Sequence, residues 1–179
     1  MGVCCIYSMI EKIELKGTYG YKNFITNEEK QTFLEWIDNN EDKFKSYHPN
    51  RKSFKFENET SVDYLITEIK NRIINLEYIS NWKKEPRYLD YIGINSKNGS
   101  IPLHIDANDG NFIHTRYNVI LSYPEKGGES IYGDNINILE ENMVWKCVAG
   151  KMKHGSTLVE SDKRRITFSL GFLIENSNI

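Results

Sequence analysis

The 179-residue sequence lacks several features that would have decided its class at once. Its three cysteines, Cys4, Cys5 and Cys147, do not make a disulfide framework, and no secretory signal precedes them. The formal net charge is only −2, so no global positive charge is present to hold nucleic acid. No apolar run approaches the roughly 18 residues of a membrane span. These absences predict a soluble, intracellular protein in a reducing compartment.

What the sequence contains is the composition of an ordinary globular domain. Hydrophobic residues make up 39% of the chain and charged residues 27%, which is typical of soluble folded proteins. No internal repeat, low-complexity segment or linker divides the sequence. A chain of this length can bury a sizeable core, so we predict a single domain over residues 1–179.

The first five residues, Met-Gly-Val-Cys-Cys, match a lipidation signal only in part. The myristoylation pattern requires Ser or Thr at the sixth position, and Ile6 stands there. The alternatives to lipidation at Gly2, Cys4 or Cys5 are a frayed terminus or a true start at Met9. The mismatch at the sixth residue favours these alternatives.

Two amphipathic helices are predicted between about residues 20 and 80. Thr26 and Glu29 have capping-box spacing, with Thr26 as the N-cap, and an apolar stripe follows them. A second helix is predicted from near Ser61, because apolar residues recur there at helical spacing. They are Val62, Leu65, Ile66, Ile69, Ile73 and Leu76. Both stripes are expected to pack against a sheet, and the polar segment 43–58 is expected to be a solvated loop.

From residue 88 onward the pattern changes to short strands separated by turn residues. Strands are predicted at 88–95, 101–106, 116–123, 130–132, 136–138, 144–148 and 165–174. Because the helices come only before these strands, the pattern indicates an α+β protein that is mainly β. We predict a jelly-roll core over about residues 85–175, buttressed by the N-terminal helices.

Three side chains are candidate metal ligands. His104 and Asp106 are two residues apart on a predicted strand, so their side chains lie on the same face. His154 follows later in the chain, and two His with one carboxylate form the open site of non-haem Fe(II) oxygenases. An isolated His-x-Asp pair is weak evidence, because a strand-end histidine that hydrogen-bonds its neighbour gives the same pattern. His48 and His114 are predicted to be structural or surface residues.

An anion-binding group is predicted on the last strand. Arg165 and Thr167 share one face of this strand, whereas Ile166, Phe168 and Leu170 share the apolar face. An inward-facing Arg needs an anionic partner, because an unpaired buried charge is very costly. Arg165 is therefore the candidate carboxylate receptor, and a shift of one residue in register would give that role to Arg164.

These residues together resemble the signature of the 2-oxoglutarate/Fe(II)-dependent dioxygenase superfamily. Its His-x-Asp…His…Arg motif is matched by His104, Asp106, His154 and Arg165. The resemblance implies a double-stranded β-helix (jelly-roll or cupin-like) core, with Fe(II) as the metal and 2-oxoglutarate and O2 as co-substrates. It further implies that a substrate C–H bond is hydroxylated while succinate and CO2 are released.

The resemblance also implies how 2-oxoglutarate is held. Its 2-oxo and C1 carboxylate groups would bind the metal, and its C5 carboxylate would meet Arg165 and Thr167. Tyr91 (or Tyr88) and Asn118 complete the candidate cofactor-binding set. The carboxylate ligand Asp106 favours hydroxylation over halogenation, because halogenases of this superfamily lack it.

A narrower resemblance points to the prolyl 4-hydroxylase-like branch. Segments 116–123 and 127–130 are similar to strands and a Gly-Gly-Glu turn of that branch, and the helix entry at 24–29 is a weaker match. The branch usually carries Lys where Arg165 stands. The branch resemblance implies a protein or peptide side chain as the substrate.

The loops 107–114 and 129–135 are expected to surround the metal, because specificity usually resides in loops on a rigid sheet. The candidate substrate-rim residues are Phe112, Arg116, Glu129 and Tyr132.

Other functions remain open at this point. One is a nucleic-acid demethylase of the same superfamily, in which basic residues of segment 43–58 would follow phosphates. These residues are Lys43, Lys45, Arg51, Lys52 and Lys55, for which a solvated loop is the favoured alternative. A small-molecule substrate is another possibility. A non-catalytic jelly-roll binding module is the alternative from a different class. The oligomeric state is not predicted.

Overall fold

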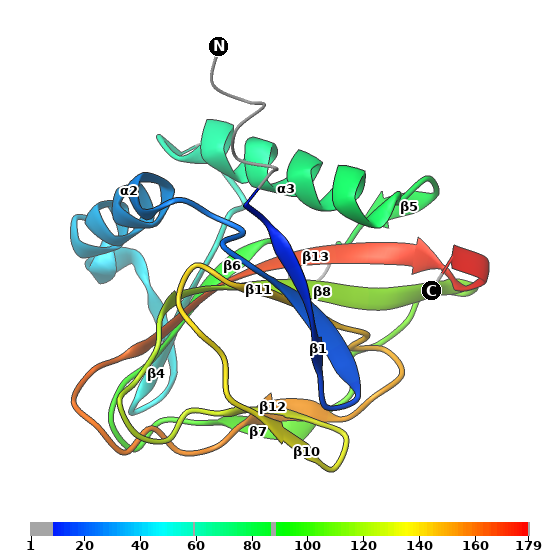
Figure 1. The fold of residues 1–179 in the computed structure, drawn as a ribbon. Coiled ribbons are helices and arrows are strands. Elements are labelled where there is room, and N and C mark those ends of the chain that lie inside the picture. Colours follow the sequence, from blue (N-terminus) through cyan, green and yellow to red (C-terminus); the bar gives the residue numbers. More distant parts are fainter. Residues whose placement is uncertain (1–8, 59, 87–88, 179) are drawn as a thin grey trace.

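The computed structural model describes residues 9–58, 60–86 and 89–178 (Figure 1). The candidate lipidation residues Gly2, Cys4 and Cys5, and also Tyr88, lie outside the described residues. Within the described part, the strands form one nine-stranded and one four-stranded antiparallel sheet. Two helices cover the outer face of the larger sheet, and the smaller sheet faces its other side (Figure 1).

The larger sheet runs in the order β1 (Glu11–Leu15), β2 (Thr18–Lys22), β11 (Val144–Cys147), β8 (Phe112–Ser122), β13 (Arg165–Glu175), β6 (Tyr91–Asn95), β4 (Arg51–Lys55) and β3 (Lys45–His48), and β5 (Trp82–Lys84) also pairs with β13. The smaller sheet runs in the order β10 (Asn135–Asn137), β9 (Ser130–Tyr132), β12 (His154–Ser156) and β7 (Ile101–His104). The helices are α2 (Asn27–Asp38), α3 (Asp63–Glu77) and the 3-10 turns η1 (Glu41–Lys43) and η2 (Asn176–Asn178). Two facing antiparallel sheets buttressed by N-terminal helices confirm the predicted fold class.

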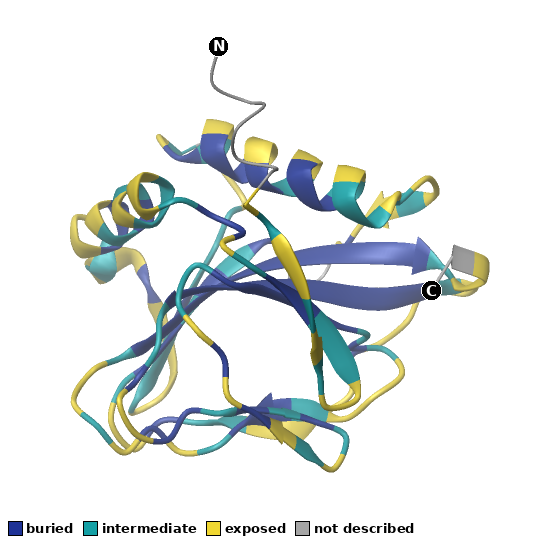
Figure 2. Ribbon diagram, in the orientation of Figure 1, coloured by how far each residue is buried: buried dark blue, intermediate teal, exposed yellow. Residues whose placement is uncertain are grey.

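The two predicted helices are present with the predicted signals. The capping box of α2 forms as expected, since the Thr26 side chain accepts from the Glu29 N–H and the Glu29 carboxylate accepts from the Thr26 N–H. Both helices bury the face turned toward the sheet and expose the other (Figure 2). No helix in the described ranges combines the length and apolarity that a membrane crossing requires.

The central strands β8 and β13 have two different faces, and this division positions the site. Phe168, Leu170 and Phe172 of β13 belong to the core under the helices, where the rings of Phe168 and Phe33 lie 4.8 Å apart. Thr167, by contrast, points into the space between the two sheets. The period-two alternation of β13 thus separates an apolar buttress from a polar interior.

The N-terminal third is not only helical, as the sequence pattern had indicated. Segment 43–58, predicted as a solvated loop, forms the β3–β4 hairpin, and β4 pairs with β6. Phe54 of β4 packs on Trp36 of α2, with ring centroids 4.9 Å apart, and Ser53 on the opposite face is buried. Charged residues flank Ser53 and Phe54, so the sequence shows only a weak alternation of apolar and polar residues here. The segment forms a strand because it pairs with β6.

The β1–β2 hairpin was also not predicted. It turns at Gly17, whose φ of +79° suits glycine, and β2 pairs with β11. The larger sheet therefore extends well before residue 85 and takes in β3 and β4, which lie within the part of the chain expected to be helical.

A buried carboxylate joins α3 to the larger sheet. Glu77, at the end of α3, accepts hydrogen bonds from the hydroxyls of Tyr19, Tyr21 and Tyr117, the last at 2.8 Å. The ammonium of Lys146 lies 3.1 Å from the same carboxylate. Burial alone would raise the pKa of Glu77, but these tyrosines and Lys146 outweigh it and hold the pKa below its ordinary value. The Glu77 cluster is therefore ionised and fully partnered at neutral pH.

We predict that Glu77→Gln destabilises the protein by roughly 3 kcal/mol, because it leaves the Lys146 charge buried without its partner. Urea unfolding at pH 7 measures this loss. Because the pKa of Glu77 is lowered in the folded state, its contribution is present above the unfolded carboxyl pKa and is lost as the pH falls through the folded value. The difference between the two proteins should therefore shrink in acid.

The matched control is Glu140→Gln, because the ion pair of Glu140 with Lys22 is exposed. It should change the stability by less than about 0.5 kcal/mol. An equal loss in both variants would contradict the role given to the Glu77 cluster.

Candidate metal centre and co-substrate cavity

Strand pairing in the smaller sheet brings the predicted ligands together. His154 on β12 lies directly opposite His104 on β7, and their ring centroids are 4.2 Å apart. Asp106 follows β7, and its backbone N–H donates to the carbonyl of Ala149 at 2.9 Å. One ligand atom from each of these three side chains lies within 4.8 Å of the others. A Cβ at Gly155 would stand 2.5 Å from the carbonyl oxygen of Ile101, so this close approach requires glycine.

Backbone carbonyls fix the tautomers of both imidazoles. Nδ1 of His104 lies 2.8 Å from the carbonyl oxygen of Pro102, and Nδ1 of His154 lies 3.1 Å from that of Met152. A carbonyl oxygen only accepts, so each Nδ1 carries the proton. Each Nε2 then has a free lone pair, which is the state in which histidine binds a metal.

The spacing and charge of the three groups fit a divalent metal. Nε2 of His104 lies 3.4 Å from Oδ1 of Asp106, and Nε2 of His154 lies 3.9 Å from Oδ2. Neighbouring ligands with bonds of about 2.1 Å stand roughly 3 Å apart, so little movement is needed. Burial alone would raise the pKa of Asp106, but His104 and the nearby positive charges hold it below its ordinary value. The carboxylate is therefore ionised.

The two imidazoles differ in their pKa values. When protonated, His104 can donate from Nε2 to Asp106, which raises the pKa of His104, whereas burial together with the charge of His104 lowers the pKa of His154. The lowered pKa favours the neutral ring of His154, which is the form that binds a metal.

Behind Asp106 lies a second, fully buried layer. Nδ1 of His114 lies 3.2 Å from Oδ2 of Asp106, and Nε of Arg116 lies 3.6 Å from the same oxygen. Arg116 also faces Glu85 at 3.4 Å and donates to the carbonyl of Leu89 at 3.0 Å. Burial and the charge of Arg116 lower the pKa of His114 to about 4, so its ring is neutral. This layer fixes the orientation of the Asp106 carboxylate.

A cavity of about 420 Å³ opens from the metal ligands and contains Arg165. The Arg165 side chain is buried, and it donates one hydrogen bond to the Ser130 hydroxyl at 3.0 Å. Its Nε and the Thr167 hydroxyl have no hydrogen-bond partner. Among the described residues, no carboxylate forms an ion pair with Arg165, and burial lowers its pKa. Such a guanidinium needs an anion from outside the protein.

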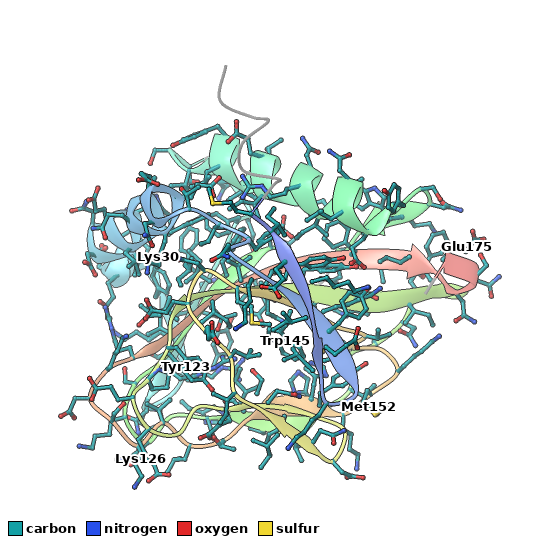
Figure 3. All side chains as sticks on the ribbon, viewed as in Figure 1. Lys30, Tyr123, Lys126, Trp145, Met152 and Glu175 are labelled. Atoms are coloured by element: carbon teal, nitrogen blue, oxygen red, sulfur yellow. The ribbon has the colours of Figure 1, made fainter. Side chains whose placement is uncertain are left out.

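Further polar groups line this cavity. Tyr91, Asn118 and Trp145 all contribute to it, and the indole N–H of Trp145 lacks a partner. Figure 3 shows Trp145 between the two sheets, whereas Lys126 and Glu175 lie at the periphery. An anion bound in this cavity would satisfy the unpartnered donors of Arg165, Thr167 and Trp145.

Comparison with known proteins was made at the level of sequence and of structure. No protein-family model and no curated protein matches the sequence. The structure resembles the viral collagen prolyl hydroxylase vCPH from Paramecium Bursaria Chlorella virus-1, in its 2OG complex. The TM-score is 0.64 at 14% identity, over 96% of this chain and 99% of that chain.

Two bacterial proteins are similar as well. HygX from Streptomyces hygroscopicus, with nickel and 2-oxoglutarate bound, gives a TM-score of 0.69 at 9% identity, over 95% of this chain and 85% of that one. A Pseudomonas putida prolyl-4-hydroxylase gives 0.61 at 8% identity, over 87% and 91%.

The chain has the fold of 2-oxoglutarate-dependent oxygenases. The resemblance inferred from the His-x-Asp…His…Arg motif is thereby confirmed at the level of the fold, over nearly the whole chain. This oxygenase fold carries a candidate facial triad of His104, Asp106 and His154.

The predicted cofactor-binding residues all line the cavity of this oxygenase fold. They are Arg165, Thr167, Tyr91 and Asn118. Arg164 points away from the cavity, where it bonds Glu41 at 2.9 Å. Strand alternation thus sets the two neighbouring arginines on opposite sides of the sheet.

The predicted rim residues behave differently, and only Arg116 lines the cavity, where it lies buried beneath Asp106. The Glu129 carboxylate accepts a hydrogen bond from the Thr157 hydroxyl, and Tyr132 is buried against Trp145. Phe112 lies under the ammonium of Lys83, 3.9 Å from its ring centroid. In loops 107–114 and 129–135, the side chains of Phe112, Glu129 and Tyr132 therefore contact other parts of the protein and do not line the cavity.

Two contributors to the site are not among the site residues predicted from the sequence. His114, predicted to be a structural or surface residue, alternates with Arg116 and Asn118 on β8 and so shares their inward face, where it lies buried beside Asp106. The β3–β4 hairpin supplies the rim that the loops do not, through Tyr47, His48, Arg51, Ser53 and Lys55. No local signal identified this hairpin, because its position depends on pairing with β6.

We predict that His114→Ala weakens metal binding by about 10- to 100-fold, because Asp106 loses the group that orients it. Calorimetric titration with Ni(II) measures the affinity. His114→Gln, whose side-chain amide can donate to the Asp106 carboxylate, should recover part of the loss. Unchanged affinity in His114→Ala would contradict the orienting role.

Proposed function

We propose that this protein is an Fe(II)- and 2-oxoglutarate-dependent oxygenase that hydroxylates a C–H bond of its substrate. The observation that carries the proposal is the convergence of two imidazoles and a carboxylate, with an unpaired buried guanidinium across the same cavity. A non-catalytic binding module gives no reason for this combination. The fold shared with oxygenases supports the same conclusion.

In this proposal His104, Asp106 and His154 hold Fe(II) on one side and leave its other side open. Arg165 receives the C5 carboxylate of 2-oxoglutarate with the help of Thr167, and Tyr91 and Asn118 line the space between. When bound, Fe(II) with 2-oxoglutarate and O2 supplies the oxidising power, so that one oxygen atom enters the substrate and one enters succinate as CO2 leaves.

The charges of the protein suit this arrangement. Asp106 offsets part of the metal charge, and Arg165 offsets the distal carboxylate. His114 and Arg116 keep Asp106 in place, so the ligand set is formed before the metal arrives. By holding the distal carboxylate, Arg165 would fix how the co-substrate lies relative to the rim.

We further propose that the substrate is a protein or peptide side chain. Segment 116–123 and the likeness to two prolyl hydroxylases support a peptide. HygX, which has been seen with hygromycin B bound, makes a small molecule the alternative. The nucleic-acid alternative is not favoured, because Lys52, one of the five basic residues of segment 43–58, is neutralised by Glu41 and the net charge of the chain is −2.

We predict that anaerobic addition of Fe(II) and 2-oxoglutarate produces a weak visible charge-transfer band at about 500 nm, as the chelate in such a site implies. Asp106→Ala, His104→Ala and His154→Ala should each abolish the band and succinate release. Asp109→Ala, whose carboxylate is exposed nearby, should retain both. Absence of the band in the unaltered protein would favour a binding module.

We also predict that Arg165→Ala weakens 2-oxoglutarate binding by roughly 10- to 100-fold, since a charge-assisted hydrogen bond contributes about 1.5–3 kcal/mol. Titration of the visible band measures this affinity. Arg165→Lys should recover part of it, because the positive charge is kept. Arg164→Ala should bind normally, and a loss there instead would contradict the assignment.

A further inference from the structure

The β3–β4 hairpin brings positive charge to the cavity beyond what 2-oxoglutarate would neutralise. Asp106 is the one carboxylate that lines the cavity in the described part of the chain, and metal and imidazoles surround it. Arg116 faces Glu85 and Asp106, and Arg165 would be neutralised by the C5 carboxylate. Arg51 has no such counterpart.

Strand alternation explains why Arg51 faces inward. Arg51, Ser53 and Lys55 share the cavity face of β4, whereas Lys52 faces outward and pairs with Glu41 at 3.1 Å. Arg51 pairs in register with Asn95, which in turn pairs with Arg165. The guanidinium of Arg51 forms no ion pair or hydrogen bond with any residue in the described ranges. Arg51 is half-buried, so its charge is only partly solvated and is available to an anion in the cavity.

Arg51 lines the same cavity as the three candidate metal ligands and the proposed co-substrate receptor Arg165. An anion received by Arg51 would therefore lie in that cavity, at the edge formed by the β3–β4 hairpin.

A second cavity extends the rim outward. It measures about 600 Å³ and shares Tyr47, Ser53 and Lys55 with the metal cavity. Lys43 and Lys45 also line it, and Glu57 is the one carboxylate among its described lining residues. The two adjoining cavities give an extended, positively charged path that suits a chain-like molecule.

We propose that the hairpin selects a peptide that carries a carboxylate or phosphate beside the oxidised residue, with Arg51 receiving that anion. This inference rests on the proposed oxygenase function and defines its substrate class. A bidentate contact from Arg51 would both hold the peptide and fix its position along the rim.

The test measures peptide binding to protein loaded with Zn(II), which has no redox chemistry, and 2-oxoglutarate. Four rhodamine-labelled peptides differ only in the residues that flank a central proline, which are Gln, Glu, phosphoserine or Lys. Fluorescence anisotropy should show the Glu or the phosphoserine peptide binding at least about tenfold more tightly than the Gln peptide, with the advantage reduced by salt. The Glu and phosphoserine arms distinguish a carboxylate from a phosphate.

Variants assign the effect to Arg51. Arg51→Gln should remove the advantage of the anionic peptides, and Arg51→Lys should retain most of it. Lys52→Gln, on the same strand but facing outward, should leave it unchanged. Equal binding of the Gln and both anionic peptides, or an advantage that survives in Arg51→Gln, would overturn the proposal.

The two proposals fail in different ways. The same preparations are tested for the visible band with Fe(II) and 2-oxoglutarate. A normal band without any charge preference overturns only the substrate class. A missing band overturns the oxygenase function and this inference with it.

Discussion

The pairing of β12 with β7 is the constraint on which the site depends. It sets His154 opposite His104 and holds Asp106 beside them, although the two strands are far apart in the sequence. Side chains alternate along a strand, so a slip of one residue would turn His154 to the outer face of the smaller sheet. Gly155 permits the close approach of the backbones that this register needs. The pairing of these strands therefore determines the positions of the three candidate ligands.

The larger sheet supplies the opposite half of the site by the same alternation. One face of β13 packs under the helices through Phe168 and its neighbours, and the Glu77 cluster joins α3 to that sheet from the same side. This support leaves the other face free to carry Arg165 and Thr167 into the interior. Because the buried guanidinium of Arg165 has no carboxylate partner among the described residues, the cavity is suited to bind an anion.

Much of this could be predicted from local patterns. The capping box of Thr26, the strands around the ligands and the inward face of Arg165 follow from spacing alone, because they depend on period and turn chemistry. The β3–β4 hairpin could not be predicted in this way, because its residues form strands only through the pairing of β4 with β6. The predicted rim residues Glu129 and Tyr132 do not line the cavity. The carboxylate of Glu129 is bonded to Thr157 and Tyr132 packs on Trp145, and the sequence gives no sign of these contacts.

The central claim is tested most directly by a crystal structure of the protein with Mn(II) and 2-oxoglutarate. The account predicts the metal bound to Nε2 of His104, Nε2 of His154 and the carboxylate of Asp106. It predicts the distal carboxylate of 2-oxoglutarate on the guanidinium of Arg165, with the Thr167 hydroxyl beside it. A metal bound elsewhere, or a distal carboxylate that leaves Arg165 unpaired, would contradict it.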